Sequence, residues 1–318
     1  MKFYFAPLEG ITDFSFRTAY HQYFPGIDKF FSPFISTGEG FLKRKRDRED
    51  IDPCHNRQIN LVPQLLTNHS RGFTEAVRQL SDYGYHQINL NIGCPSGTVV
   101  AKGKGSGQLK DLEKLDRFFE EVFRELSDKT VEISVKTRIG IRDNCEAEEL
   151  IRLYNRYPLH ELIIHPRYQK QFYKGKPDLE TFERMLEESV HPVCYNGDIE
   201  SVADYRRIEK RFPKIKAVMI GRGLLKNPAL IRKIQGGAPA QKEEVIAYYK
   251  SLERFILETL PEEQKNHFHL KEFWSYFGKL FEGSDKLVKE ILKSKDAASY
   301  NGAVAVLFSR CEIREEKV

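Results

Sequence analysis

The chain has 318 residues, of which 40% are hydrophobic and 31% are charged, and its formal net charge is +5 at pH 7. This composition is typical of an ordinary soluble protein, and no apolar run approaches the roughly 18 residues that a membrane helix requires. The first residues contain too short an apolar stretch for a secretory signal. We therefore expect a cytoplasmic monomer with no membrane partner.

The cysteines argue against two further classes of protein. They are odd in number, lie far apart and form no Cys-x-x-Cys pair: Cys54, Cys94, Cys145, Cys194 and Cys311. A disulfide framework or a structural zinc site would need paired, closely spaced cysteines. Each cysteine is therefore treated as a separate thiol.

Short apolar or alternating segments recur along most of the chain, and helical patterns separate most of them. The predicted strands cover residues 3–6, 28–34, 60–66, 87–92, 131–138, 161–165, 192–196 and 215–220. The predicted helices begin at about residue 14 and then cover 70–82, 111–126, 145–157 and 181–188. Eight strands in this rhythm predict an α/β fold, a (β/α)8 TIM barrel over residues 1–238.

Beyond the barrel only helical patterns follow. They cover residues 242–260, 265–281, 284–294 and 296–308. We therefore predict a small C-terminal α-helical bundle domain over residues 239–318. Its aromatic residues can form a core or a base-stacking surface, and a core is the commoner use: Phe268, Phe273, Trp274, Tyr276 and Phe277.

Two basic segments of the barrel could contact phosphate. Residues 42–48 include five basic side chains in seven, which fits either a solvated loop or helix face or a phosphate-contacting patch. Residues 102–107 form a glycine-rich stretch with Lys102 and Lys104, which we expect to be a loop outside any rigid element. A single glycine-rich loop is weak evidence for phosphate binding.

One cysteine follows a strand directly. The strand at 87–92 is broken by Gly93 and Pro95, so Cys94 falls just beyond its C-terminal end. In a parallel α/β barrel the catalytic residues lie at that end. The alternative is a small buried hydrophobe, the commoner role of a free cysteine.

Polar residues follow other strands in the same way. They are Gln64, Asn91, Lys136, His165, Asn196 and Arg222. All lie at or just beyond strand ends, so they should surround one pocket. A turn former would explain each alone, but six on one rim are costly to bury without partners.

The chemistry of this rim suits flavin mononucleotide (FMN). The segments Asn196-Gly197-Asp198 and Gly221-Arg222-Gly223 lie where such barrels bind phosphate. Lys136 and His165 could stabilise negative charge on a reduced flavin, and Gln64 suits an amide-like ring edge. The pattern contains no cluster of metal-ligand type, so we expect no metal.

Cys94 would then lie within reach of a flavin and could donate a proton as a general acid. A nucleophilic role would normally need a neighbouring histidine as base, and none lies in the adjacent sequence.

The successive motifs resemble those of the tRNA-dihydrouridine synthase family. They are residues 6–13 (APLEGITD), 91–95 (NIGCP), 135–140 (VKTRIG), 165–167 (HPR) with Gln171, Tyr173, Gly175 and Asp178, then 196–198 (NGD) and 221–223 (GRG). Their order matches that family across the barrel. Residues 269–276 are similar to the family's helical domain, closest to its bacterial C-type branch.

The resemblance implies FMN-dependent, NADPH-driven reduction of the C5–C6 double bond of a uridine in tRNA, with Cys94 protonating C5. It implies FMN contacts from Pro7, Leu8, Glu9, Gln64, Lys136, His165, Asn196, Gly197, Asp198, Gly221 and Arg222. It places Asn91 and Arg167 at the uracil and makes the helical bundle a tRNA-binding domain. Where the family often has a basic residue after the cysteine, this chain has Gly97-Thr98-Val99, so Lys102 or Lys104 would supply that charge near the RNA.

Three alternatives remain open. The chain could form dihydrouridine in another structured RNA such as rRNA, or it could be an FMN barrel reductase of free pyrimidines. It could also be an RNA-binding protein that has lost catalysis, although the presence of Cys94 and Lys136 argues against this.

Overall fold

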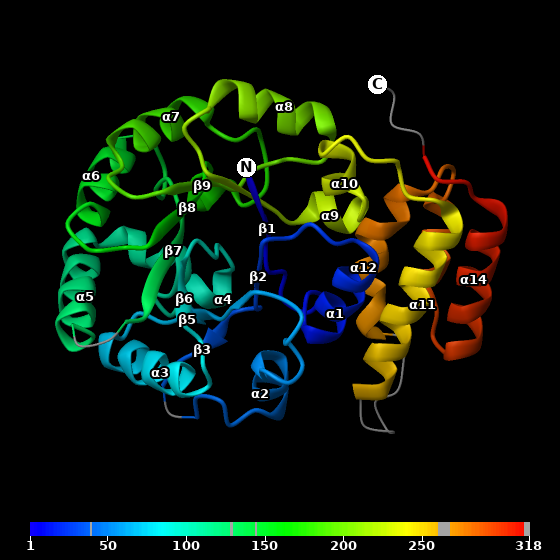
Figure 1. Ribbon diagram of the computed structural model, residues 1–318, viewed down its shortest axis with the longest axis horizontal. Coiled ribbons are helices and arrows are strands. Elements are labelled where there is room, and N and C mark those ends of the chain that lie inside the picture. The colour runs from blue at the N-terminus through cyan, green and yellow to red at the C-terminus, as the bar shows by residue number, and fades with distance from the viewer. Residues whose placement is uncertain (39, 128–129, 144, 260–267, 315–318) are drawn as a thin grey trace.

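The computed structural model describes residues 1–38, 40–127, 130–143, 145–259 and 268–314. Its centre is one curled sheet of parallel strands, surrounded by helices (Figure 1). The strands are β1 (Lys2–Phe5), β2 (Lys29–Phe31), β3 (Ile35–Ser36), β4 (Leu61–Val62), β5 (Gln64–Leu66), β6 (Gln87–Ile92), β7 (Glu132–Arg138), β8 (Glu161–His165), β9 (Val193–Tyr195) and β10 (Ala217–Ile220).

The sheet has ten strands, where eight are predicted. The predicted strand at 28–34 contains only β2, and β3 follows just beyond its end, whereas the one at 60–66 is divided into β4 and β5. Pro33 and Pro63 lie at the two interruptions, and proline has no backbone N–H to donate to a neighbouring strand. Because β2 pairs with β4 and β3 with β5, the sheet closes on itself. The predicted TIM-barrel fold class is confirmed.

The helices and helical turns of the barrel follow its strands in the chain. They are α1 (Phe14–Tyr23), α2 (Lys45–Ile51), α3 (Ser70–Asp82), α4 (Gly97–Val100), η1 (Gly105–Lys110), α5 (Leu112–Glu125), α6 (Cys145–Tyr154), η2 (Gln169–Gln171), α7 (Leu179–Glu188), α8 (Val202–Arg211), α9 (Arg222–Lys226) and α10 (Leu230–Ile234). The prediction omitted α8, whose buried residues are only Tyr205 and Ile208. So narrow an apolar face gives a weak periodic signal.

The C-terminal helices pack beside the barrel (Figure 1). They are α11 (Lys242–Thr259), α12 (Phe268–Phe277), η4 (Gly278–Leu280), α13 (Asp285–Lys293) and α14 (Ala297–Arg310). α11 packs against α1 and α12 against α9, so the bundle contacts both ends of the barrel sequence. The division of the chain between residues 238 and 239 stays a prediction.

Aromatic residues form much of the bundle core. Phe273, Trp274 and Phe277 are buried, and the Trp274 indole donates to the Tyr300 hydroxyl at 2.9 Å. Tyr276 is only partly buried, and the side chain of Phe268 lies outside the described residues. None of the described helices combines the length and apolarity needed to cross a bilayer.

Candidate active site

A cavity of about 400 Å³ lies at the C-terminal ends of the strands. Most of the predicted site residues line it: Pro7, Leu8, Glu9, Gln64, Asn91, Cys94, Lys136, His165, Asn196, Gly197, Asp198, Gly221 and Arg222. Parallel strands end together on one rim, which explains why residues more than 200 positions apart in the chain meet there. Arg167, Lys102 and Lys104 are not among the lining residues.

Cys94 is held by contacts on both sides of its peptide. The Asn91 side-chain oxygen accepts hydrogen bonds from the backbone N–H groups of Gly93 at 3.0 Å and Cys94 at 2.9 Å. The Cys94 carbonyl in turn accepts from the Ser106 N–H at 3.0 Å and from the Ser106 hydroxyl at 2.8 Å. Burial raises the pKa of the Cys94 thiol, so the group is protonated at neutral pH.

The glycine-rich segment packs against this cysteine, and the expectation that it lies outside rigid structure is wrong. Residues 105–110 form the 3-10 helix η1, in which Gly105 to Leu109 are buried. Gly105 has φ +56°, and a Cβ there would lie 2.7 Å from the Cys94 carbonyl oxygen. Only glycine permits both this backbone conformation and this approach. Lys102 is exposed and Lys104 partly buried beside the turn.

A chain of amides crosses the floor of the cavity. The Gln64 side chain donates to the Asn89 oxygen at 2.8 Å and accepts from the Asn91 amide at 2.7 Å. Asn89 donates onward to the Ser134 hydroxyl at 2.9 Å. These bonds fix the orientation of each amide. Gln64 and Asn91 each keep one N–H for a ligand.

Lys136 and Arg138 leave strand β7 on the same face because successive side chains alternate. Burial, with the neighbouring Arg138 charge, lowers the pKa of Lys136 to about 8. Lys136 forms no ion pair within the described part of the chain. Arg138, which the sequence prediction missed, donates to the carbonyls of Gly93 at 2.9 Å, Tyr168 at 2.9 Å and Phe172 at 2.8 Å.

His165 is neutral in this site. Burial, reinforced by the surrounding cations, lowers its pKa well below 6.5. Its Nε2 lies 3.1 Å from Nη1 of Arg167, which can only donate. Nε2 must therefore be the acceptor, and the ring proton lies on Nδ1.

Arg167, Asp198 and Arg222 form the pocket cluster. Arg167 contacts both carboxylate oxygens of Asp198, one of them at 3.0 Å, and Arg222 donates to Asp198 at 2.7 Å. The remaining donors of Arg167 meet His165 and the carbonyls of Lys174 and Gly175. Its side chain is 1% exposed. In this structure the N–H groups of Arg167 are all engaged within the protein, and the uracil contact expected for it stays a prediction.

Backbone approaches the cavity closely at the ends of β9 and β10. A Cβ on Gly223 would lie 2.1 Å from the Ile199 carbonyl oxygen, so only glycine fits. The Asn196 amide donates to the Met219 carbonyl at 2.8 Å and so joins the two strand ends. This corner combines backbone N–H groups with the Arg222 guanidinium, which suits a phosphate.

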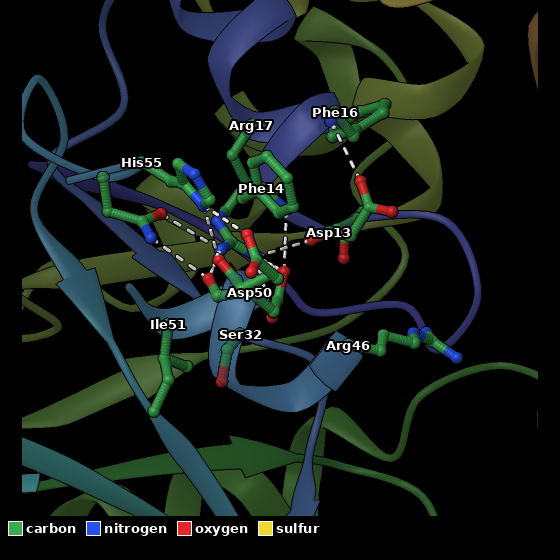
Figure 2. A network of polar contacts seen from close by, with 12 residues as sticks. Asp13, Phe14, Phe16, Arg17, Ser32, Arg46, Asp50, Ile51 and His55 are labelled. Carbon is green, nitrogen blue, oxygen red and sulfur yellow. Dashed lines mark hydrogen bonds and ion pairs between the residues drawn. The ribbon is translucent and has the colours of Figure 1, made fainter. Parts of the chain in front are cut away.

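The β1–α1 loop is held by the support cluster of Arg17, Asp50 and Asn56, of which Figure 2 labels Arg17 and Asp50. Arg17 donates to the Thr12 carbonyl at 2.9 Å and lies 3.1 Å from the Asp50 carboxylate. Asp50 also accepts from the Phe14 N–H at 2.7 Å. The basic segment at 42–48 is partly explained by this arrangement, since its Arg46 pairs with Glu9 at 3.4 Å.

Further residues that do not lie at strand ends also line the cavity. They are Tyr173 from the β8–α7 segment and Glu272 and Tyr276 from α12. Arg138 and Arg222 lie over the Tyr173 ring at 5.7 Å and 4.9 Å from its centre. The two α12 residues are four positions apart and so share one helix face. Within the described residues, no three His, Cys, Asp or Glu side chains gather in a metal-binding group.

Comparisons with known proteins agree on one protein family. A family model described as "Dihydrouridine synthase (Dus)" matches residues 4–301. The tRNA-dihydrouridine(16) synthase of Pseudomonas syringae pv. tomato is 30% identical over 252 residues, covering 77% of this chain and 78% of that protein. A Staphylococcus epidermidis protein named "Probable tRNA-dihydrouridine synthase" is 25% identical and covers 99% of this chain and 96% of its own.

Solved structures support the fold. The old yellow enzyme homologue from Zymomonas mobilis matches with a TM-score of 0.54 and 11% identity, covering 76% of this chain and 90% of that one. Morphinone reductase in complex with tetrahydroNAD matches with a TM-score of 0.52 and 11% identity, covering 75% and 88%. At such low identity these matches carry the barrel architecture alone.

Proposed function

Because the chain belongs to the dihydrouridine synthase family, an oxidoreductase family, we propose that it reduces the C5–C6 double bond of a specific uridine in tRNA to 5,6-dihydrouridine. The proposed cofactor is bound FMN, reduced by NADPH. The observation that carries this proposal is the placement of a protonated thiol, Cys94, in one cavity with Lys136, His165 and Arg222.

The donor set fits FMN. Lys136 is a partly buried cation without a carboxylate partner in the described part of the chain, and a reduced flavin would supply the missing negative charge. The neutral His165 would donate its Nδ1 proton to the ring. Gln64 would use its free N–H on the ring edge, while Pro7, Leu8 and Glu9 would lie along one side of the flavin.

The phosphate of FMN would lie at the other end of the cavity. Asn196, Gly197, Gly221 and Arg222 would hold it, with Asp198 fixing Arg222 in place. Bound FMN, once reduced, supplies a hydride, which family chemistry delivers to C6 of the uracil.

Cys94 would complete the reduction by giving its Sγ proton to C5. The hydride adds two electrons at C6, and the proton balances the charge at C5, so the thiol becomes a thiolate that regains its proton from solvent. Asn91 would hold the uracil with its free N–H while its oxygen fixes the Cys94 peptide.

The remaining predicted residues take indirect roles in this proposal. Arg167 positions His165 and Asp198. Lys102 and Lys104, outside the cavity, would contact the tRNA backbone. Glu272 and Tyr276 belong to the C-terminal bundle and line the cavity. A free pyrimidine would not need contacts from the bundle, so their position favours a large substrate.

The test is Cys94→Ala, with Cys94→Ser as the matched variant. Loss of a general acid should lower turnover on tRNA by about 10²- to 10⁴-fold, while the flavin absorbance of the purified protein stays at the wild-type level. Single-turnover reduction of tRNA by the pre-reduced protein measures the step. A Cys94→Ala protein that keeps its turnover would refute the assignment.

Mapping dihydrouridine in RNA from a deletion strain tests the substrate. The name of the Pseudomonas syringae relative makes tRNA position 16 the first position to inspect. A lost modification in rRNA with intact tRNA would favour another structured RNA, and activity on free bases alone would favour a pyrimidine reductase.

A further inference from the structure

Two neighbouring aromatic side chains are exposed in the segment between β8 and α7. Phe172 is 48% exposed and Tyr173 is 56% exposed. Among the described residues, they are the only large hydrophobic side chains exposed at adjacent positions. Tyr173 lines the cavity, whereas Phe172 does not. Phe172 therefore lies beside the cavity mouth, outside the proposed uracil and flavin contacts.

The backbone at Phe172 adopts a conformation that bulky residues avoid. Its φ is +52°, and Leu42, at +56°, is the other non-glycine residue with positive φ in the described part of the chain. Leu42 is 7% exposed, so burial of its side chain offsets the strain. The Phe172 ring gains no such burial in the free protein.

Two backbone contacts hold this conformation. The Phe172 N–H donates to the Gln169 carbonyl at 3.2 Å, and Arg138 donates to the Phe172 carbonyl at 2.8 Å. Arg138 also holds the Gly93 carbonyl, next to Cys94. The exposed ring is thus fixed relative to the catalytic loop, and strain of this kind is typical of functional positions.

The surrounding charge favours a polyanion. Residues 166–177 contain Arg167, Lys170, Lys174 and Lys176 and no carboxylate. Arg167 points its donors inward, but the three lysines are exposed and form no ion pair with a described residue. Exposed aromatic rings among unpaired cations are the usual surface for single-stranded or unstacked nucleic acid.

We propose that the Phe172 ring stacks on the nucleotide next to the target uridine, in the space left when that uridine enters the cavity. Lys170, Lys174 and Lys176 would contact phosphates of the same strand. Extruding a base from a folded RNA costs stacking energy, and an inserted aromatic ring replaces part of it. This inference rests on the proposed function, because it requires RNA as the substrate.

Phe172→Gly tests it with full-length, FMN-loaded protein. Glycine accepts positive φ freely, so the variant should fold at least as well as the wild type while lacking the ring. We expect kcat/KM on folded tRNA to fall roughly 5- to 150-fold, the range for loss of one base–aromatic stack. The loss should be clearly smaller on an unstructured oligonucleotide, where no stacked base has to be extruded.

Two variants sharpen the result. Phe172→Trp keeps a stacking ring and should retain most of the activity. Tyr83→Ala removes a ring that is 40% exposed at the C-cap of α3, at the barrel end opposite the cavity, and should change nothing. Flavin content and the rate of flavin reduction by NADPH should be unchanged in every variant.

Equal losses on folded and unstructured RNA, or wild-type kcat/KM in Phe172→Gly, would overturn the inference. Failure of the wild type to form dihydrouridine would instead overturn the proposed function. The two failures are therefore distinguishable in one set of assays.

Discussion

The support cluster and the pocket cluster both join arginine to aspartate, but they differ in how many cations each carboxylate meets. Asp50 meets one guanidinium, that of Arg17, and both side chains are at most 8% exposed. Asp198 meets two, those of Arg167 and Arg222, and is 33% exposed. The support cluster contacts no functional group of a residue that lines the cavity. The pocket cluster forms part of the cavity wall.

The pKa values of the two carboxyls move in opposite directions as a result. Burial raises the pKa of Asp50 to about 6 despite the charge of Arg17. Burial also acts to raise the pKa of Asp198, but the bonds and charges of Arg167 and Arg222 outweigh it and leave the pKa below 3.8. Asp50 is more deeply buried, meets one cation and lies near the Asp13 charge, whereas the more exposed Asp198 meets two cations.

The largest effect that would test this comparison is the removal of Arg17. Arg17→Met leaves Asp50 buried without a cation, which should lower the free energy of unfolding by about 3–5 kcal/mol. Arg167→Met should cost less, because Asp198 keeps Arg222 and access to water. Urea unfolding of both proteins measures the difference, and Arg17→Lys, which keeps the charge, should fall between wild type and Arg17→Met. Equal losses in the two Met variants would contradict the distinction.

The Arg17 variants also probe how far the support cluster matters for the site. Arg17 holds the β1–α1 loop, which contributes Pro7, Leu8 and Glu9 to the cavity. Because the β1–α1 loop should be held less firmly in Arg17→Met, this variant should bind FMN more weakly than the wild type. Arg17→Lys, which keeps the charge, should restore the FMN affinity. Flavin fluorescence quenching on titration with FMN reports this.

The sequence predicted the barrel and the residues at its strand ends because both follow from local patterns. Strand alternation and the turn residues after each strand are visible without tertiary contacts. The same logic could have found Arg138, which lies two positions after Lys136 on one strand face. The prediction names only Lys136 from this strand.

Other features depended on contacts that no local pattern encodes. Glycines in residues 102–107 suggested a loose loop, yet Gly105 is there because the chain folds back on Cys94. Arg167 follows a strand as a substrate contact would, and its bonds to Asp198, 31 positions later, depend on tertiary structure. Glu272 and Tyr276 reach the cavity from a separate helix, so their role required the packing of the bundle on the barrel.

A pH titration of stability gives the next largest effect. Because folding raises the pKa of Asp50 from 3.8 to about 6, its contribution to stability is most favourable below pH 4 and is lost as pH rises to 6. The opposite holds for Asp198, whose contribution is present above pH 4 and is lost on further acidification. Stability differences between wild type and Asp50→Asn should therefore change by about 2–3 kcal/mol between pH 4 and 6.

Asp198→Asn is the matched control for that titration. Its difference from wild type should be flat between pH 5 and 7 and should shrink only below about pH 4. Guanidinium unfolding at half-unit pH steps resolves both slopes. A pH-dependent difference for Asp198→Asn in the window assigned to Asp50 would show that the two clusters titrate together.

The smallest effect should come from Arg46, the exposed neighbour of the support cluster. Its pair with Glu9 spans 3.4 Å, with the two side chains 59% and 51% exposed. Solvent screens such a pair, so Arg46→Ala should change the free energy of unfolding by less than about 1 kcal/mol. A thermal melt at two salt concentrations measures it, with Arg71→Ala in the exposed Arg71–Glu75 pair as control. A larger loss for Arg46 alone would mean that the β1–α1 loop is held from its exposed side as well, and that burial of Arg17 and Asp50 is not what sets its position.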